Sequence, residues 1–212
     1  VHTVTQSVFS LPLRSALNCA NLSVADGVPL VWFSGLKRQK IRSRVCGPDF
    51  MADFFQCFPN ERFGLLGGKE GVAQKVARAF GLEYAISYSP PLRDFSLATA
   101  YEDWERFLDL CPDRVAPPMV WVGLGAPKQE LWVQTVSALA PGTLFLAVGA
   151  AFDFLSGEKR RAPQWLQKIG LEWAFRLVSE PRRLTKRYLL YNTLFIALAA
   201  LDFLLDLLGV KY

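Results

Sequence analysis

The chain has 212 residues, of which 51% are hydrophobic and 20% are charged, and this composition excludes an intrinsically disordered protein. Its formal net charge is +5, which directs attention to anionic partners. The four cysteines are far apart and the only histidine is His2, which argues against a disulfide framework, a zinc site and a histidine-based catalytic triad.

The chain shows a series of strand–loop–helix units, in which a short apolar run ends in a turn and a helical pattern follows. A strand within residues 22–32 would end at Asp26 and Gly27. In chain order, the later segments are a strand over 62–68, a helix over 69–81, a strand over 119–125, a helix over 127–140 and a strand over 143–149.

Apolar strands that alternate with helices predict an α/β fold with a parallel sheet flanked by helices on both faces. Ligands of such sheets bind outside the carboxyl ends of the strands, so we expect Asp26, Gly67, Gly68, Gly123 and Gly125 to converge there. From Ala162 the sequence changes to Trp, Arg and Leu at helical spacing. We therefore divide the chain into a domain over 1–160 and a basic, amphipathic appendage over 161–212.

The stretch VWVGLGAPKQELW, residues 120–132, joins a strand to a helix. Unpaired N–H groups and the dipole at a helix start suit a phosphate. The stretch is not a complete dinucleotide or P-loop motif, because Lys128 stands at the third Gly position and no Gly-Lys-Ser/Thr follows. A tight turn for close packing is the alternative interpretation, whereas the Gln129 amide favours a sugar or a base.

Two acidic positions carry competing interpretations. Asp26 either forms a structural Asp-Gly turn or provides a carboxylate that acts as a general base at the end of a strand. Arg44 and Asp49 lie on either side of a Gly-Pro turn, where a surface salt bridge is the simpler interpretation.

The positive charge is concentrated between residues 159 and 187, a segment that contains nine basic residues and only two acidic ones, Glu172 and Glu180. There is no Asp-x-Asp pair to hold a divalent ion against a nucleotide diphosphate. Arginines would then neutralise the diphosphate, and a solvated basic helix face is the alternative. The candidates are Arg176, Arg182, Arg183 and Arg187.

The C-terminal segment is strongly apolar. Its apolar stretch, residues 189–201, is shorter than the roughly 20 residues that span a bilayer, and Asp202 and Asp206 interrupt the apolar residues beyond it. We therefore expect a helix that lies on a membrane or docks on the domain. The N-terminus lacks the pattern of a signal peptide, and the dispersed cysteines fit a cytoplasmic protein.

Six stretches in this order resemble the WecG/TagA/CpsF glycosyltransferases. They are DGVPLVW, RVCGPDFM, FGLLGGKEGVAQK, YSPPLRDFS, VWVGLGAPKQELW and the block from VGAAFDFLSGEK to LTKRYL. The resemblance implies a Rossmann-like fold of the GT-E type with a helical C-terminal appendage. It also implies inverting transfer of an N-acetylmannosamine-type sugar from a UDP donor to a polyprenyl-diphosphate-linked sugar, in cell-wall or exopolysaccharide synthesis.

The resemblance also implies site residues. Asp26 matches the catalytic base, Gln129 the active-site glutamine and Arg44 an arginine near the reaction centre. The expected donor-binding residues are Gly67, Gly68, Gly123, Gly125, Pro127, Lys128, Glu130, Arg176, Arg183 and Arg187. No metal or other cofactor is expected, and the enzyme would lie on the inner face of the cytoplasmic membrane through its appendage, with a homo-oligomer left open.

Two alternatives remain from the sequence. One is an α/β protein that binds nucleic acid through the basic patch over 159–187, although no RNA-binding signature is present. The other is an inactive scaffold of the same fold, because family members carry a Thr-x-Asn-type strand at a place that would precede Val1.

Overall fold

The computed structural model describes residues 1–36 and 40–208, except for the side chains of residues 168, 183, 186, 187 and 207. It divides into two compact units. Residues 12–21 and 47–160 form the sheet unit, and residues 1–11, 22–46 and 161–212 form the terminal unit. Residues 1–11 and 22–46 group with the C-terminal segment because their helices pack on it, whereas the expected division placed them in a domain over 1–160.

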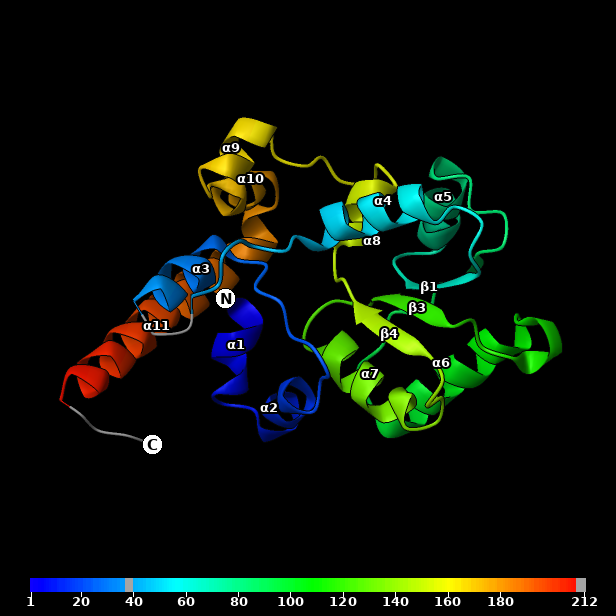
Figure 1. Ribbon diagram of the computed structural model, residues 1–212, viewed down its shortest axis with the longest axis horizontal. Helices are drawn as coiled ribbons and strands as arrows, with labels where there is room; N and C mark the ends of the chain where they lie inside the picture. Colours follow the sequence, from blue (N-terminus) through cyan, green and yellow to red (C-terminus); the bar gives the residue numbers. More distant parts are fainter. Residues whose placement is uncertain (37–39, 209–212) are drawn as a thin grey trace. The chain divides into compact units, whose positions relative to one another are not determined.

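The sheet unit contains four parallel strands in the order β2-β1-β3-β4 (Figure 1). The strands are β1 (Phe63–Gly67), β2 (Ile86–Tyr88), β3 (Met119–Gly123) and β4 (Leu144–Ala147). β1 is buried along its whole length, which fits a strand covered on both faces. The α/β class with a parallel sheet flanked by helices is therefore confirmed.

Seven helical segments accompany this sheet. They are α2 (Leu11–Asn18), α4 (Gly47–Cys57), α5 (Val72–Ala79), α6 (Leu97–Asp109), the 3-10 turn η1 (Pro112–Arg114), α7 (Lys128–Ser137) and α8 (Ala151–Leu155). The sequence signals for α6 are clear, since Ser96 caps it in a capping box with Thr99.

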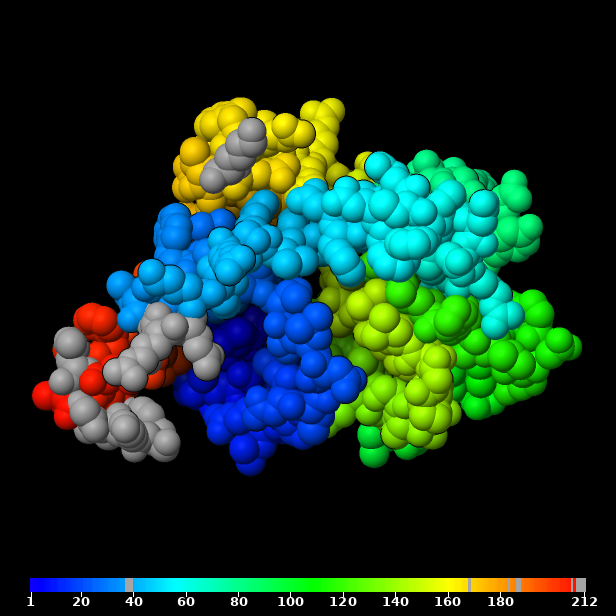
Figure 2. All heavy atoms as spheres, viewed as in Figure 1, coloured from blue at the N-terminus to red at the C-terminus, as the bar shows by residue number. Residues whose placement is uncertain are grey.

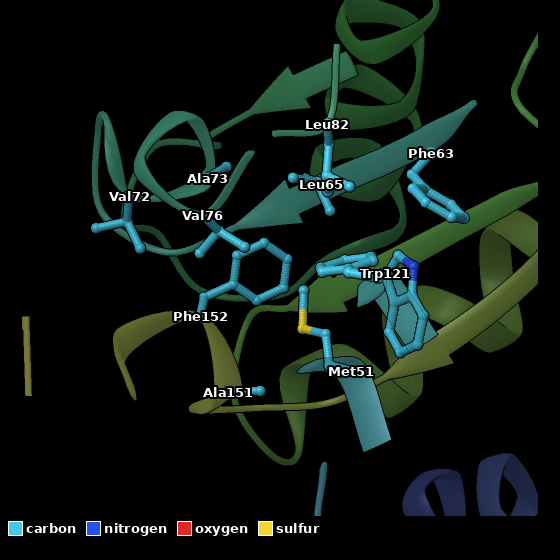
Figure 3. Packing of buried hydrophobic residues seen from close by; sticks show 11 residues of the cluster. Met51, Phe63, Leu65, Val72, Ala73, Val76, Leu82, Trp121, Ala151 and Phe152 are labelled. Atoms are coloured by element: carbon cyan, nitrogen blue, oxygen red, sulfur yellow. The ribbon is translucent and has the colours of Figure 1, made fainter. Parts of the chain in front are cut away.

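The first core lies between one face of the sheet and helices α4, α5 and α8 (Figure 3). Trp121 of β3 is fully buried there against aromatic rings of α4, with Phe55 at a centroid distance of 5.3 Å. Phe152 of α8 and Val76 of α5 close the same cluster. Side chains alternate along a strand, so the neighbouring positions of β3 face the other side.

The second core lies on the opposite face, under α6 and α7. Val120 and Val122 of β3 pack there with Trp104 of α6 and Trp132 of α7. The two tryptophan rings meet edge to face at 6.2 Å. Helices on both faces thus fix the sheet and leave the ends of its strands for loops.

The terminal unit is helical in its described part. Its helices are α1 (His2–Ser7), α3 (Val28–Gly35), α9 (Gln164–Lys168), α10 (Glu172–Ser179) and α11 (Pro181–Leu207). The His2 ring contacts Tyr191 of α11 at 4.4 Å, and the Phe33 ring contacts Phe195 of α11 at 6.1 Å. α1 and α3 therefore pack along α11, which explains why the two ends of the chain form one unit.

The strand expected before Asp26 is wrong. Residues 22–26 have no regular structure, and the Val45 N–H donates to the Ala25 carbonyl at 2.9 Å without a ladder. The physical reason is pairing: a strand needs a neighbour, and the described strands pair only with one another. A helix, α3, begins directly after Asp26 and Gly27.

The expectation that the apolar tail is too short to cross a bilayer needs correction. Within α11, the 19-residue segment Tyr188–Asp206 has a mean hydropathy of 1.8, and none of it is buried inside the protein. By length and composition alone, this segment could cross a bilayer. Atoms near the end of α11 are visible in red at the surface of the terminal unit in Figure 2.

Candidate active site

The carboxyl ends of β1 and β3 bring two glycines into register. Gly67 is paired with Gly123, and the Gly68 N–H donates to the Gly123 carbonyl at 3.1 Å. A Cβ atom on Gly67 would lie 2.6 Å from that carbonyl, and Gly67 has a φ of +135°. The two backbones can approach this closely only because Gly67 lacks a side chain.

Gly123 is also required by packing. A Cβ atom there would lie 2.3 Å from the Phe152 ring of α8. Gly125 differs, because it has a φ of +77° and no atom within 4 Å of a built Cβ. The packing interpretation of this loop therefore explains Gly123, whereas Gly125 provides a left-handed turn with open space beside it.

Gln129 holds the turn before α7. Its side chain is 6% exposed, its Oε1 accepts from the Gly125 N–H at 3.2 Å, and its Nε2 donates to Oε1 of Glu130 at 3.2 Å. Pro127 caps α7 after a cis peptide bond with Ala126. The amide of Gln129 thus fixes the conformation of the loop that leads to α7.

Lys128, the first residue of α7, lies beside that loop. Its Nζ donates to the Arg93 carbonyl at 3.1 Å, and partial burial lowers the pKa of its amine. Arg93 is itself fixed by two hydrogen bonds. Its Nη2 donates to Oδ1 of the fully buried Asp103 at 2.6 Å, and its Nη1 donates to the Glu102 carboxylate at 2.7 Å. Lys128 is therefore a cation at a helix start whose position is set by its neighbours.

Asp26 belongs to the terminal unit. Asp26 is an exposed residue, although the surrounding protein partly desolvates its carboxyl. Desolvation by these surroundings is the main cause that raises the pKa of Asp26, and the negative charge of Glu172 adds to it. Arg44 and a hydrogen bond with Cys46 act in the opposite direction. An accessible carboxyl with a raised pKa is suited to proton transfer.

Arg44 and Arg161 form an ion-pair network with Glu172, one of the charges that shift the pKa of Asp26. Both terminal nitrogens of Arg44 donate to Oε2 of Glu172 at 3.1 Å. Arg161 approaches the other Glu172 oxygen at 3.5 Å and donates through Nη2 to the Cys46 sulfur at 3.1 Å. Arg44 thus pairs with Glu172 of α10. The sequence had instead suggested a surface salt bridge between Arg44 and Asp49, on either side of the Gly-Pro turn.

The sequence model of the glycosyl transferase WecG/TagA/CpsF family matches residues 1–206. The chain belongs to this family. It is similar to the N-acetylglucosaminyldiphosphoundecaprenol N-acetyl-beta-D-mannosaminyltransferase of Bacillus subtilis (strain 168), with 29% identity over 169 residues. That match covers 79% of this chain and 64% of the relative, so the chain spans less than two thirds of the relative's length.

The family resemblance assigned donor contacts to arginines of the appendage. Arg176 lies on α10 and is half-buried. The side chains of Arg183 and Arg187 lie outside the described part of the structure, so their expected roles stay predictions. Arg182 is exposed at the start of α11.

The structure also identifies residues that sequence reasoning missed. In this member of the WecG/TagA/CpsF family, Arg161 contacts Cys46 and Glu172, and Arg93 with Asp103 supports Lys128. In the sequence, Cys46 and Arg93 were visible only as parts of the longer stretches RVCGPDFM and YSPPLRDFS. The contacts of Arg161 with Cys46 and of Lys128 with Arg93 join residues 115 and 35 positions apart, so local sequence pattern does not predict them.

No group of three or more His, Cys, Asp or Glu side chains that could hold a metal ion occurs among the residues the structure describes. Metal-independent transfer stays a prediction for this family member.

Proposed function

We propose that the chain is an inverting glycosyltransferase that moves an N-acetylmannosamine-type sugar from a UDP donor to a sugar linked to a polyprenyl diphosphate. The observation that carries the proposal is the exposed residue Asp26, whose carboxyl has a raised pKa and is influenced by the Glu172–Arg44 ion pair, in a chain of this family. The activity for which the Bacillus subtilis relative is named supports the choice of sugar and acceptor.

The proposed reaction is a single displacement at the anomeric carbon. The acceptor oxygen forms a bond to that carbon while the bond from the carbon to the diphosphate oxygen breaks. UDP leaves with the electron pair from the opposite face, which inverts the configuration. Asp26 takes the proton from the acceptor hydroxyl, and the raised pKa of its carboxyl strengthens it as a base.

In the sheet unit, the start of α7 is the proposed binding place for the diphosphate. The open turn at Gly125, the N–H groups of the first turn and the ammonium group of Lys128 all favour negative charge. Arginines of the appendage would supply further charge without a divalent cation.

The decisive experiment incubates the protein with a panel of UDP-sugars and a short-chain polyprenyl-diphosphate-linked sugar, and detects the product by mass spectrometry. We expect one donor to give a product of inverted configuration, and the Asp26→Asn variant to give far less. Binding of UDP without product from any donor would instead support an inactive scaffold. Binding of nucleic acid that is independent of UDP and falls steeply with salt would support the nucleic-acid alternative.

A lipid-linked acceptor requires contact with a membrane, and one face of α11 is suited to it. Between residues 189 and 208, nine exposed residues fall within an arc of about 140°, at 100° per residue. Eight of the nine are apolar. This apolar face of α11 consists of Leu189, Leu190, Thr193, Ile196, Ala197, Ala200, Leu201, Leu204 and Leu208.

The acidic residues of the helix do not interrupt this face. Asp202 and Asp206 lie roughly 150° or more around the helix from the centre of the apolar face. The sides that contain Tyr191 and Phe195 pack against His2 and Phe33. Arg182, exposed about two turns before the apolar face, is placed to meet anionic headgroups.

The packing favours a helix in the plane of the membrane over a span. The contact between Phe33 and Phe195 places α3 against the middle of α11. A spanning α11 would carry α3 into the hydrocarbon, where the unpaired backbone groups at the helix ends are costly. We therefore propose peripheral association with the inner face of the cytoplasmic membrane through the apolar face of α11.

Vesicles that contain anionic phospholipid test this association. Burial of a leucine-sized side chain is worth about 1.5–3 kcal/mol, so Ile196→Glu and Leu201→Glu should each weaken partitioning about tenfold or more. Leu139→Glu is the matched control, because Leu139 is an exposed leucine of the sheet unit. Equal sedimentation of all variants with vesicles would contradict the membrane contact. If the two α11 variants instead lost self-association in lipid-free analytical ultracentrifugation, the apolar face of α11 would bind a second copy of the chain rather than a membrane.

A further inference from the structure

A fully buried carboxylate lies beside the loop that joins β2 to α6. It belongs to Asp103 of α6, and the next residue, Trp104, is part of the second core. Burial removes the water that would stabilise the negative charge, so the side chain needs a cationic partner. That partner is Arg93 of the loop, whose Nη2 donates to Oδ1 of Asp103 at 2.6 Å.

This pairing uses only part of the carboxylate. Oδ2 of Asp103 is buried and has no hydrogen-bond partner among the residues that the structure describes. A buried carboxylate with an unpaired oxygen stabilises a fold less than a well-packed apolar side chain does. Core packing therefore does not account for an aspartate at this position, and the contact with Arg93 is the physical role that remains.

Arg93 connects α6 to the start of α7. Besides Asp103, its guanidinium group contacts two further groups of α6, the Thr99 carbonyl at 3.4 Å and the Glu102 carboxylate at 2.7 Å. Its main-chain carbonyl accepts from Nζ of Lys128 at 3.1 Å. Arg93 thus binds α6 with its side chain and Lys128 with its backbone.

The loop that contains Arg93 is anchored at its other end as well. The Ser89 hydroxyl lies 3.3 Å from the Gly67 carbonyl and 3.1 Å from the Lys69 carbonyl, and two prolines follow Ser89. The prolines restrict the backbone between the two anchors. The loop is therefore fixed to the end of β1 through Ser89 and to α6 through Arg93, and a change at Asp103 weakens the second anchor.

We propose that Asp103 is a positioning residue of the donor site, which holds the Lys128 ammonium group at the start of α7 through the side chain and the carbonyl group of Arg93. The proposal rests on the proposed function, because it takes the start of α7 as the binding place for the diphosphate. An aspartate that only stabilised α6 would change the free energy of unfolding and leave the titration of Lys128 as it is.

The charges around Lys128 determine the sign of the test. Desolvation is the main cause that lowers the pKa of the Lys128 amine. Asp103 of α6 raises this pKa, Arg93 of the loop lowers it, and Asp94 of the loop raises it. Removal of the Asp103 charge should therefore lower the pKa of Lys128 further, so that the amine loses its charge at a lower pH.

The experiment compares Asp103→Asn, Lys128→Gln and the variant that carries both substitutions. NMR of lysine side chains labelled with ¹³C at the ε position gives the pKa of the Lys128 amine without turnover, and calorimetry gives the affinity for UDP. We expect Asp103→Asn to move the Lys128 titration to lower pH and to weaken UDP binding about threefold or more. The variant with both substitutions should bind UDP no more weakly than Lys128→Gln, because Asp103 acts through Lys128.

Two further variants control for effects on the fold. Glu105→Gln changes an exposed carboxylate of the same helix, which pairs with Arg114, and should leave both readouts unchanged. Arg93→Gln combined with Asp103→Asn leaves no buried charge unpaired, so it serves if Asp103→Asn alone does not fold. It should also weaken UDP binding, because the Arg93 carbonyl is no longer held to α6. Thermal unfolding of each variant verifies that the fold is intact.

The two readouts separate the possible failures. A Lys128 titration and a UDP affinity in Asp103→Asn that match the unmodified protein would overturn the role of Asp103. Additive losses of affinity in the variant with both substitutions would overturn it as well, since the effect would not pass through Lys128. A displaced Lys128 titration, together with unchanged UDP binding by Lys128→Gln, would retain the link from Asp103 to Lys128 and refute the place proposed for the diphosphate.

Discussion

Gly123 at the end of β3 and Phe152 of α8 are in such close contact that a methyl group on Gly123 would lie 2.3 Å from the ring. This contact lets α8 cover the sheet beside the loop that leads to α7. The glycine is thus part of the core as well as of the loop.

Gly123→Ala should destabilise the sheet unit. Forced overpacking of a filled core costs about 1–3 kcal/mol, since Phe152 or the strand must move. Urea unfolding followed by fluorescence of the buried tryptophans measures the change. Gly142→Ala is the control, because nothing lies within 4 Å of its built Cβ. Equal stability of the two variants would show that the contact is not tight.

Asp26→Asn should lower turnover by roughly 10²–10⁴-fold, the usual contribution of a general base, while UDP affinity changes little. The same substitution should slightly stabilise the protein at neutral pH. The folded-state pKa of Asp26 is raised, so its ionised form is disfavoured on folding, and the stability it contributes is lost as the pH rises through that pKa.

Thermal unfolding of Asp26→Asn between pH 3 and 8 measures this effect. The difference from the unmodified protein should be largest at neutral pH and should disappear below the unfolded pKa of about 3.9. Asp53→Asn, at an exposed position of α4, should show neither effect. Full turnover of Asp26→Asn would remove Asp26 from the role of base.

Lys128→Gln should weaken UDP binding by about 10–100-fold, because a charged hydrogen bond to an anion contributes about 1.5–3 kcal/mol. The lowered pKa of Lys128 adds a pH dependence, since affinity should decline as the pH rises through that pKa and the amine loses its charge. Isothermal titration calorimetry at several pH values measures both. Lys75→Gln is a surface control, and equal affinity of both variants would exclude Lys128 from the donor site.

Glycosyl transfer should survive removal of divalent cations. Arginines, Lys128 and the helix start would neutralise the diphosphate, and the described residues form no carboxylate or histidine cluster for a metal. Activity after EDTA treatment and gel filtration is the measurement. An absolute requirement for Mg²⁺ or Mn²⁺ would contradict the prediction.

Local sequence pattern predicted the sheet unit well because its signals are local. The strands over 62–68, 119–125 and 143–149 appear as β1, β3 and β4, and the helices after the two glycine turns appear as α5 and α7 within a few residues. The strand before Asp26 was wrong, because an apolar run does not show whether a pairing neighbour exists.

The sequence by itself determined the fold class, the glycine turns at the strand ends and the apolar, basic character of the C-terminal segment. Hydrophobic period and turn chemistry act between residues that are close along the chain, so they are visible without coordinates. Only the tertiary structure decided that Arg44 pairs with Glu172, 128 residues away, and that Arg161 contacts Cys46, 115 residues away. It also decided which face of α11 is covered by α1 and α3, because such contacts depend on packing between segments that the order of residues does not bring together.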